Sequence, residues 1–307
     1  MSDIYADSVD GDDGTGDGSS GNPYQSLLTA VTNATDNDTI YLVPQGSSNV
    51  YSWISDSIPA GLTIKSTSTL IDRPGYNNVY LDGGSAVRQW SLNGDFTMED
   101  IYIQNVYSST NASPIKYPNV AGNSTITFNR CVIDETQHNL STGGRGGFVG
   151  NGNSVSLGNP TAINTYFNNC RISNFTMGGG SYCAFVHQTY GITFTYFQEC
   201  TIYNDSSSNG EKIVGEYTAA GEAPTFRNCI IRNEYATDLG IYMKYSDTTS
   251  YSGSVLNYCN YTGLDATNVA DSTLTSCTTA NPLFRDPSAG DYNIQKDSTI
   301  FGTGLLV

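Results

Sequence analysis

Acid–base chemistry has one compact candidate group in this sequence, formed by Asp134, Glu135 and His138. A histidine changes charge near neutral pH, and a neighbouring carboxylate can exchange a proton with it or orient it. This is the one stretch in which either of the 2 histidines stands close to carboxylates. General acid–base catalysis is therefore one interpretation, and a polar surface turn, which we favour, is the other.

A second group combines cations with a carboxylate, and its members are Lys212, Glu216, Arg232 and Lys244. A Lys or Arg could remove a proton from an acidic sugar, and a second cation could neutralise the carboxylate of that sugar. These residues are the best candidates in the chain for polysaccharide lyase chemistry. They do not displace the non-catalytic interpretation reached below.

Metal ligands are scarce. Acidic residues spaced with glycine near the start could offer carboxylate oxygens to calcium, and these are Asp10, Asp12, Asp13 and Asp17. They do not match the twelve-residue calcium loop that closes with a Glu, so we expect a solvated turn and keep calcium only as a weak candidate. No C-x-x-C and no Cys/His cluster occurs, so zinc is not expected, and neither is any other cofactor.

The charge balance excludes whole classes of partner. The chain has 29 acidic and 13 basic residues, with a net charge of -16, so it lacks the basic surface that neutralises phosphates. We therefore expect no nucleic-acid binding. No run of about 18 apolar residues occurs, so membrane insertion is not expected either. The first 20 residues lack the basic start and apolar run of a secretory signal, which predicts synthesis and retention in a cytoplasm; a secreted chain whose signal was removed is the alternative.

An internal repeat predicts the elements that would position any site. Six segments share a large apolar residue, two polar residues, a Cys, any residue, an Ile, any residue and an Asn, with departures in single copies. They begin at Phe96, Ile126, Thr165, Thr195, Pro224 and Ser254. With Ile101 in the place of the first Cys, the steps between copies are 30, 39, 30, 29 and 30 residues. A period near 30 is too short for a propeller blade and indicates a solenoid.

Within each copy the apolar residues alternate, which is typical of strands. Stacked parallel strands lie about 4.8 Å apart, so equivalent residues should form rows along the solenoid. We expect one row of buried phenylalanines, namely Phe128, Phe167, Phe197 and Phe226, and one of cysteines, namely Cys131, Cys170, Cys200, Cys229 and Cys259. The residues before these cysteines include Asp100 and Arg130, for which we expect a salt bridge across adjacent coils.

The chemistry of the cysteine row follows from the same spacing. Parallel side chains keep their Cβ atoms about as far apart as the strands, which is too far for a disulfide, so we expect free, buried thiols that act as small apolar groups. Cys183 and Cys277 are placed off this row, either paired or free. A further row is expected at a turn that tolerates left-handed backbone, formed by Asn105, Asn174, Asn204 and Asn233.

With these rows, the chain resembles the right-handed parallel β-helix proteins of the pectate-lyase-like superfamily over almost its whole length. Its opening, GDDGTGDGSSGNPYQSLLTAV followed by DTIYLVPQG, and its close, NPLFRDPSAGDYNI, resemble the first and last coils of those proteins. The implied fold is all-β, a single-domain right-handed parallel β-helix solenoid with a short N-terminal capping helix. Pro23 would lie in the first turn of that helix, with Leu27, Leu28 and Val31 on its apolar face.

The expected domain covers residues 1–307 and has four parts. Residues 1–35 form the N-terminal turn and capping helix, 36–95 the irregular first coils, 96–263 the regular coils, and 264–307 the last coil and C-terminal cap.

The resemblance implies enzymes among others, yet the tripeptides of the hydrolase branch, NTD, GHG and RIK, are all missing. The outward positions beside the repeat also lack the clustered carboxylates of a calcium-dependent lyase.

The leading hypothesis is a structural protein of a bacteriophage virion, either a capsid decoration protein or a short fibre or spike component, made in the host cytoplasm. Its expected partners are other virion proteins of capsid or tail, further copies in a homotrimer, and host-surface glycans. A polysaccharide lyase and a non-catalytic carbohydrate-binding adhesin are the alternatives.

Overall fold

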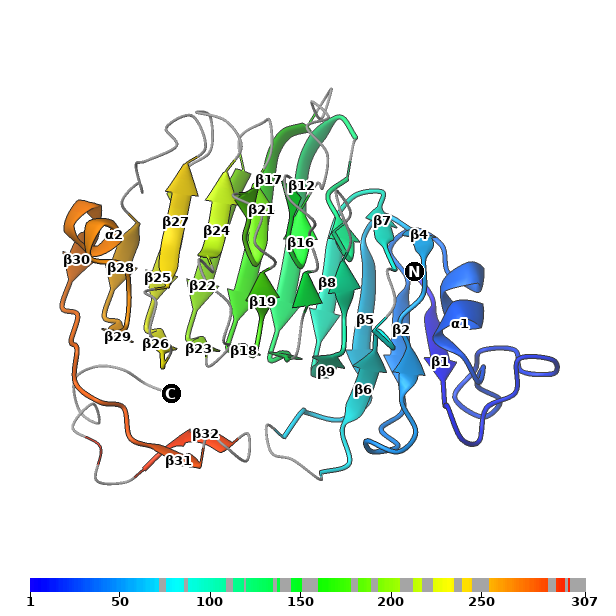
Figure 1. Ribbon diagram of the computed structural model, residues 1–307. Coiled ribbons are helices and arrows are strands. Elements are labelled where there is room, and N and C mark those ends of the chain that lie inside the picture. Colours follow the sequence, from blue (N-terminus) through cyan, green and yellow to red (C-terminus); the bar gives the residue numbers. More distant parts are fainter. Residues whose placement is uncertain are drawn as a thin grey trace.

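The strands wind into a right-handed parallel β-helix, seen side-on in Figure 1. The computed structural model describes residues 1–71, 76–85, 88–108, 113–118, 120–134, 137–138, 145–150, 160–177, 182–188, 193–204, 212–216, 223–234, 239–244, 254–286, 291–295 and 298. Strands pair in parallel throughout these residues, except for an antiparallel hairpin of β31 (Phe284–Asp286) and β32 (Asp291–Ile294). None of the described helices is long and apolar enough to cross a membrane.

Three long sheets form the walls of the solenoid. The ten-stranded sheet contains, in order, β1 (Asp3–Ala6), β2 (Thr39–Leu42), β5 (Leu62–Ser66), β8 (Phe96–Glu99), β12 (Gly122–Asn129), β17 (Pro160–Asn168), β22 (Thr193–Gln198), β25 (Thr225–Arg227), β28 (Val255–Asn257) and β30 (Thr273–Thr275). The eight-stranded sheet contains β3 (Tyr51–Ser52), β6 (Val79–Asp82), β9 (Ile101–Gln104), β13 (Val132–Ile133), β18 (Arg171–Ser173), β23 (Thr201–Asn204), β26 (Ile230–Asn233) and β29 (Asn260–Thr262). The seven-stranded sheet contains β4 (Asp56–Ile58), β7 (Trp90–Leu92), β11 (Ile115–Lys116), β16 (Val149–Gly150), β21 (Val186–Gln188), β24 (Lys212–Glu216) and β27 (Gly240–Lys244).

Two short sheets complete the coils. One contains β10 (Tyr107–Ser108), β14 (Gln137–His138) and β19 (Thr176–Met177), and the other contains β15 (Arg145–Gly146) and β20 (Tyr182–Cys183). Early coils, within residues 36–95, vary in length, yet Ile40 and Ile64 keep the register of Met98 in the later coils.

The core is built from rows of identical side chains, as the repeat predicts. Phe128, Phe167, Phe197 and Phe226 pair in register and are at most 1% exposed. Their ring centroids lie 4.8, 4.9 and 4.7 Å apart, with neighbouring planes within 7° of parallel. This spacing is the distance between strands, so each ring packs on the rings of the coils before and after it.

The cysteines form a second row, and it is longer than the sequence predicts. Cys131, Cys170, Cys200, Cys229 and Cys259 are free and buried. Cys277, which we placed off the row, continues it: β28 pairs with β30 through Leu256 and Leu274, so Cys259 and Cys277 occupy equivalent positions in consecutive coils. The prediction for Cys277 is wrong because the last coil is far shorter than 30 residues, which breaks the period. Of Cys183, only its place in β20 is described.

A third row makes the bend between the ten-stranded and eight-stranded sheets. From the coil of Ile101 onward, the residue directly before the cysteine position has a left-handed backbone with φ between 51° and 59°: Asp100, Arg130, Asn169, Glu199, Asn228, Tyr258 and Ser276. Left-handed geometry disfavours residues with a Cβ, but the bend keeps its backbone hydrogen bonds, since Arg130 N donates to Asn168 O at 2.9 Å and Asn169 N to Gln198 O at 2.8 Å. The expected salt bridge between Arg130 and Asp100 is formed within this row, at 2.8 Å.

Two of the four asparagines expected at a left-handed turn adopt that conformation, and two do not. Asn105 and Asn174 have φ of 51°, as a left-handed turn requires. Asn204 and Asn233 instead end strands β23 and β26, and they hydrogen-bond each other side chain to side chain at 3.0 Å. The four residues share a place in the repeat but not a conformation, because the later coils extend their strand by one residue.

Glycine in the left-handed row should stabilise the protein. Glu199 has φ of 57°, so Glu199→Gly is expected to raise the free energy of unfolding by about 0.5–1 kcal/mol through relief of backbone strain. The matched control is its neighbour Gln198→Gly in extended strand β22, which should lower it by about 0.5–1 kcal/mol. Thermal unfolding followed by circular dichroism measures both, and a lower midpoint for Glu199→Gly would contradict the strain argument.

Both ends of the solenoid are covered. At the first end, α1 (Leu27–Asn33) begins after Ser26, whose Oγ accepts a hydrogen bond from Thr29 N, and it buries Leu27, Ala30 and Val31. This corrects two expectations: Leu28 is 48% exposed, and Pro23 precedes the helix. The i, i+3, i+4 spacing of the buried residues selects one face, and Leu28 falls outside it.

The outer edge of β1, a strand the sequence analysis missed, is also hydrogen-bonded. Tyr5 N donates to Gly18 O at 2.7 Å and Asp7 N donates to Tyr24 O at 2.8 Å. At the other end, α2 (Ala266–Asp271) packs Val269 against the core.

The C-terminal segment folds back over the outer face of the eight-stranded sheet (Figure 1). Phe284 of β31 packs against Tyr203 and Ile230, and the rings of Phe284 and Tyr203 meet edge-on with centroids 5.7 Å apart. Arg232 holds the same segment, because its guanidinium donates to Asn281 and lies over the Phe284 ring. Residues after β30 therefore form a strap along this sheet.

Candidate functional site

Asp134, the first acid–base candidate, lies in a polar network on the outer face of the eight-stranded sheet. Tyr102 Oη donates to Asp134 Oδ2 at 2.8 Å, while Ser173 Oγ and Asn174 Nδ2 donate to Asp134 Oδ1 at 2.8 and 2.9 Å. Arg171 adds a cation, with Nη1 3.8 Å from Asp134 Oδ2. The parallel register of β9, β13 and β18 brings these residues together from three coils.

Burial decides what this network can do. The Arg171 side chain is 3% exposed and that of Asp134 is 13% exposed, so a buried cation is matched to a nearly buried carboxylate. Desolvation, followed by the charge of Asp134, raises the pKa of Tyr102 well above its usual value, so this hydroxyl stays protonated and acts as a donor. A carboxylate held by three neutral donors and a cation stabilises the sheet and is poorly placed to accept a proton from a substrate.

The other members of that group do not complete a site in the described residues. Glu135 lies outside them. His138 ends β14, where its backbone pairs with Ser108 and Met177, and its side chain is outside the described part of the chain.

The lyase candidates divide between two sheets. Lys212 and Glu216 stand at opposite ends of β24, and Lys244 at the end of β27 is the register partner of Glu216. Arg232 lies in β26 of the eight-stranded sheet, where it is bound to Glu234 and to the strap. The structure therefore places Glu216 beside Lys244 but separates Arg232 from them.

The acidic residues of the first turn bind backbone rather than each other. Asp12 Oδ1 accepts from Gly14 N at 2.7 Å, Asp17 Oδ1 from Ser19 N at 2.9 Å, and Asp13 Oδ1 from Gln25 N and Ser26 N at 2.9 Å each. The bonds from Gly14 and Thr15 hold the pKa of Asp12 below its usual value. The Asp10 N–H donates to Asp7. Among the described residues no three His, Cys, Asp or Glu side chains converge on a point where a metal could sit, so calcium gains no geometric support.

A different surface combines the chemistry that sugars require. On the outer face of the ten-stranded sheet, Tyr166 and Tyr196 stack with centroids 4.8 Å apart and planes at 10°. Phe194 lies next to Tyr196 along the same strand, at 6.4 Å. Two residues further along the strands runs a row of side-chain amides, in which Asn168 Nδ2 donates to Asn129 Oδ1 at 2.9 Å. We call this surface the tyrosine–amide face; it comprises Asn129, Tyr166, Asn168, Phe194, Tyr196 and Gln198.

The tyrosine–amide face is partly open to solvent and has no charge of its own. Gln198 is exposed and the other five residues are intermediate in exposure. Charged residues of the same row, Glu99 and Arg227, flank the amides on the two sides, and Glu99 is engaged by Arg130. The sequence signal for this face was the TYF tripeptide repeated at Tyr166 and Tyr196, which the sequence analysis used for the fold only.

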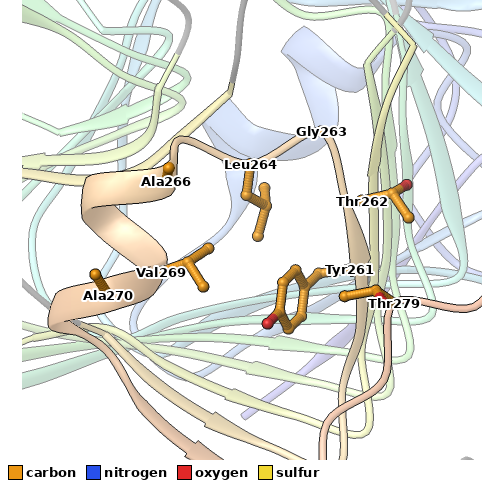
Figure 2. Close-up of a pocket in the computed structure, with 8 residues that line it drawn as sticks. All are labelled: Tyr261, Thr262, Gly263, Leu264, Ala266, Val269, Ala270 and Thr279. Atoms are coloured by element: carbon orange, nitrogen blue, oxygen red, sulfur yellow. The ribbon is translucent and has the colours of Figure 1, made fainter.

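A pocket of about 480 Å³ lies at the C-terminal end of the solenoid, shown in Figure 2. Leu264 and Val269 of the α2 region point toward Tyr261 of β29, and Thr279 of the following segment completes one wall. Tyr261 is the one titratable side chain in its lining. The lining is mainly apolar, so it offers no pair of groups for acid–base chemistry.

Comparison with known proteins assigns no function to the chain. No known protein family and no curated protein matches the chain. Among solved structures, a polygalacturonate lyase fused with a self-assembling amphipathic peptide is similar at 11% identity and a TM-score of 0.43, over 89% of this chain and 84% of that one. The pectin methylesterase from Aspergillus niger is similar at 15% identity and a TM-score of 0.38, over 86% of this chain and 91% of that one.

Neither likeness bears on activity or substrate. The chain is a capped right-handed parallel β-helix. The strap covers β23 and β26 of its eight-stranded sheet, and its ten-stranded sheet carries the tyrosine–amide face.

Proposed function

We propose that the protein is a structural surface protein of a bacteriophage virion, a capsid decoration protein or short fibre or spike component, whose tyrosine–amide face contacts neutral glycans. The observation that carries the glycan contact is the pairing of stacked aromatic rings with a parallel row of side-chain amides on one exposed sheet. Aromatic rings pack against the apolar faces of sugars. Amides donate and accept hydrogen bonds at once, as hydroxyl groups require.

The charge of the surface selects the class of glycan. Asn129, Asn168 and Gln198 are neutral, and the chain carries a net charge of -16. Uronates and sialic acids therefore meet repulsion from the chain as a whole, which the single cation of Arg227 beside Gln198 offsets only in part. Neutral hexose or hexosamine oligosaccharides meet no such repulsion. A rigid rod with covered ends, held by continuous rows of core side chains, suits a component that must present such a surface at a fixed distance from a particle.

Binding to a panel of neutral and acidic oligosaccharides, measured by calorimetry, tests the glycan contact. Tyr196→Ala and Gln198→Ala should each weaken binding of a neutral oligosaccharide about 10-fold or more, equivalent to about 1.4 kcal/mol. The matched control is Tyr41→Ala, which removes one ring of the stacked pair Tyr5 and Tyr41 elsewhere on the same sheet and should leave affinity unchanged. Absence of binding to every neutral glycan, or equal losses in all three variants, would refute the contact.

The place in a virion has its own test. Antibodies against the purified protein should label intact phage particles, and the mass in solution should be that of the expected homotrimer. Antibody labelling of the unassembled protein alone, with none on intact particles, would contradict a structural role.

A polysaccharide lyase is retained as the second candidate on the paired positions of Glu216 and Lys244 in β24 and β27. If this candidate is correct, acidic polysaccharides will release unsaturated uronate, detected by ultraviolet absorbance, and Lys244→Ala will abolish the release. No release from any acidic polysaccharide would remove it.

A further inference from the structure

The six thiols of the cysteine row share one pose, in which each donates to the carbonyl oxygen two residues before it at 3.3 to 3.5 Å. Cys170 Sγ donates to Phe128 O at 3.4 Å, Cys200 to Phe167 O at 3.2 Å, Cys229 to Phe197 O at 3.3 Å and Cys277 to Leu256 O at 3.3 Å. In each case the acceptor belongs to the preceding coil. Because the pose repeats, successive sulfur atoms are separated by about one strand spacing, roughly 4.8 Å, which matches the 4.7 to 4.9 Å between the neighbouring phenylalanine rings.

That separation fits one kind of ligand. A disulfide requires an S–S bond of about 2.05 Å, so adjacent thiols in this row cannot join without moving the strands. A metal–thiolate bond is about 2.3 Å long, and two such bonds in a straight line span about 4.6 Å. A two-coordinate ion could therefore sit between neighbouring sulfurs with little movement of the backbone, and straight two-coordinate geometry is characteristic of Cu(I) and Ag(I), the soft ions that thiolates prefer.

Only the last thiol of the row is open to solvent. Cys131 to Cys259 are at most 2% exposed within the packed core, whereas Cys277 is partly exposed. Thr279, two residues further on, lines the pocket of Figure 2. Cys259 and Cys277 occupy equivalent positions in consecutive coils, and each thiol donates to the carbonyl oxygen two residues before it, so the two sulfur atoms are neighbours.

We propose that Cys259 and Cys277 bind one monovalent soft metal ion, with Cu(I) as the reference ion, at the C-terminal end of the cysteine row. Binding displaces both thiol protons, and the ion is then held by two thiolates, the form in which cysteine binds metals. The site then carries one net negative charge, next to the partly exposed side chain of Cys277. No electron is transferred, and both protons leave to solvent.

The test is an anaerobic titration of the full-length protein with Cu(I) in competition with the colorimetric chelator bicinchoninate. The wild type should withdraw one Cu(I) per chain and release two protons, followed with a pH indicator in weakly buffered solution. Cys277→Ser should weaken binding at least 10-fold. The matched control Cys183→Ser, which removes a thiol in a different sheet, should bind as the wild type does.

Independent readouts keep the outcome decisive. X-ray absorption of the Cu(I) protein should show two sulfur ligands, and circular dichroism should show Cys277→Ser folded, since its side chain is partly exposed. Failure of the wild type to withdraw Cu(I), unchanged affinity in Cys277→Ser, equal loss in Cys183→Ser, or three or more sulfur ligands would each overturn the proposal.

Discussion

Replacing Phe167 with alanine is expected to lower the free energy of unfolding by about 3–5 kcal/mol. Phe167 is fully buried and stacks between Phe128 and Phe197, so the variant loses both ring contacts and leaves a cavity within a continuous row. Neighbouring rings cannot close the gap, because each is fixed by the register of its own coil. Urea unfolding followed by tyrosine and tryptophan fluorescence measures the loss.

The matched control is the adjacent Tyr166→Ala. Tyr166 points outward and, among the described residues, stacks on the ring of Tyr196, so its removal should cost about 0.5–1.5 kcal/mol. Equal losses at the two positions would mean that the phenylalanine row is not the main source of core stability.

Arg171→Ala is expected to cost about 3–5 kcal/mol, because it leaves the Asp134 carboxylate without its buried cation. The ion pair joins β13 and β18 across two coils, so the loss should appear as lower cooperativity of unfolding as well as a lower midpoint. Urea unfolding of the single variants and the double variant Arg171→Ala/Asp134→Asn measures the coupling.

In that cycle the double variant should recover part of the loss, because a neutral amide needs no cation. The control is Arg130→Ala, whose side chain is 40% exposed beside Asp100 and which should cost about 1 kcal/mol or less after screening by solvent. An Arg171→Ala loss as small as that of Arg130→Ala would show that the network is not buried in solution.

Rows of identical residues could be predicted from the sequence because a solenoid turns a period into a contact. Phe128 and Phe167 are distant in the chain, but they hold the same place in the repeat and therefore stack. Features outside the regular period could not be predicted in this way, because no equivalent residue in a neighbouring repeat indicates their place. Cys277 follows a short last coil, β1 precedes the first recognisable repeat, and Leu28 falls outside the narrow apolar face of a helix of two turns.

The sequence showed that the residues before the cysteines form a row, but it did not predict that their backbone is left-handed. Its members include Arg130, Glu199 and Tyr258, residue types that seldom adopt positive φ. Their conformation is imposed by the two sheets that meet there, so local propensity gives no warning.

Candidate site residues were harder to predict because charges close in sequence need not share a place in the coil. Arg232 and Lys244 are 12 positions apart, yet they belong to different sheets. Asp134 finds Arg171 in the next coil, and its sequence neighbour Glu135 lies outside the described residues. Where residues hold equal places in successive coils, as in the tyrosine–amide face, the sequence contained the information in the repeated TYF.

The bend between the ten-stranded and eight-stranded sheets affects how the length of the solenoid can change. In the regular coils one left-handed residue makes the bend from the ten-stranded to the eight-stranded sheet, and the wall strands of neighbouring coils pair in parallel. Such a coil is therefore a unit that can be added or removed whole. Each unit of about 30 residues changes the length of the rod by one strand spacing, about 4.8 Å, and carries its own ring and thiol. The number of coils therefore sets the length of the rod. Gain or loss of one repeat changes the distance between the two ends of the protein and leaves both caps unchanged.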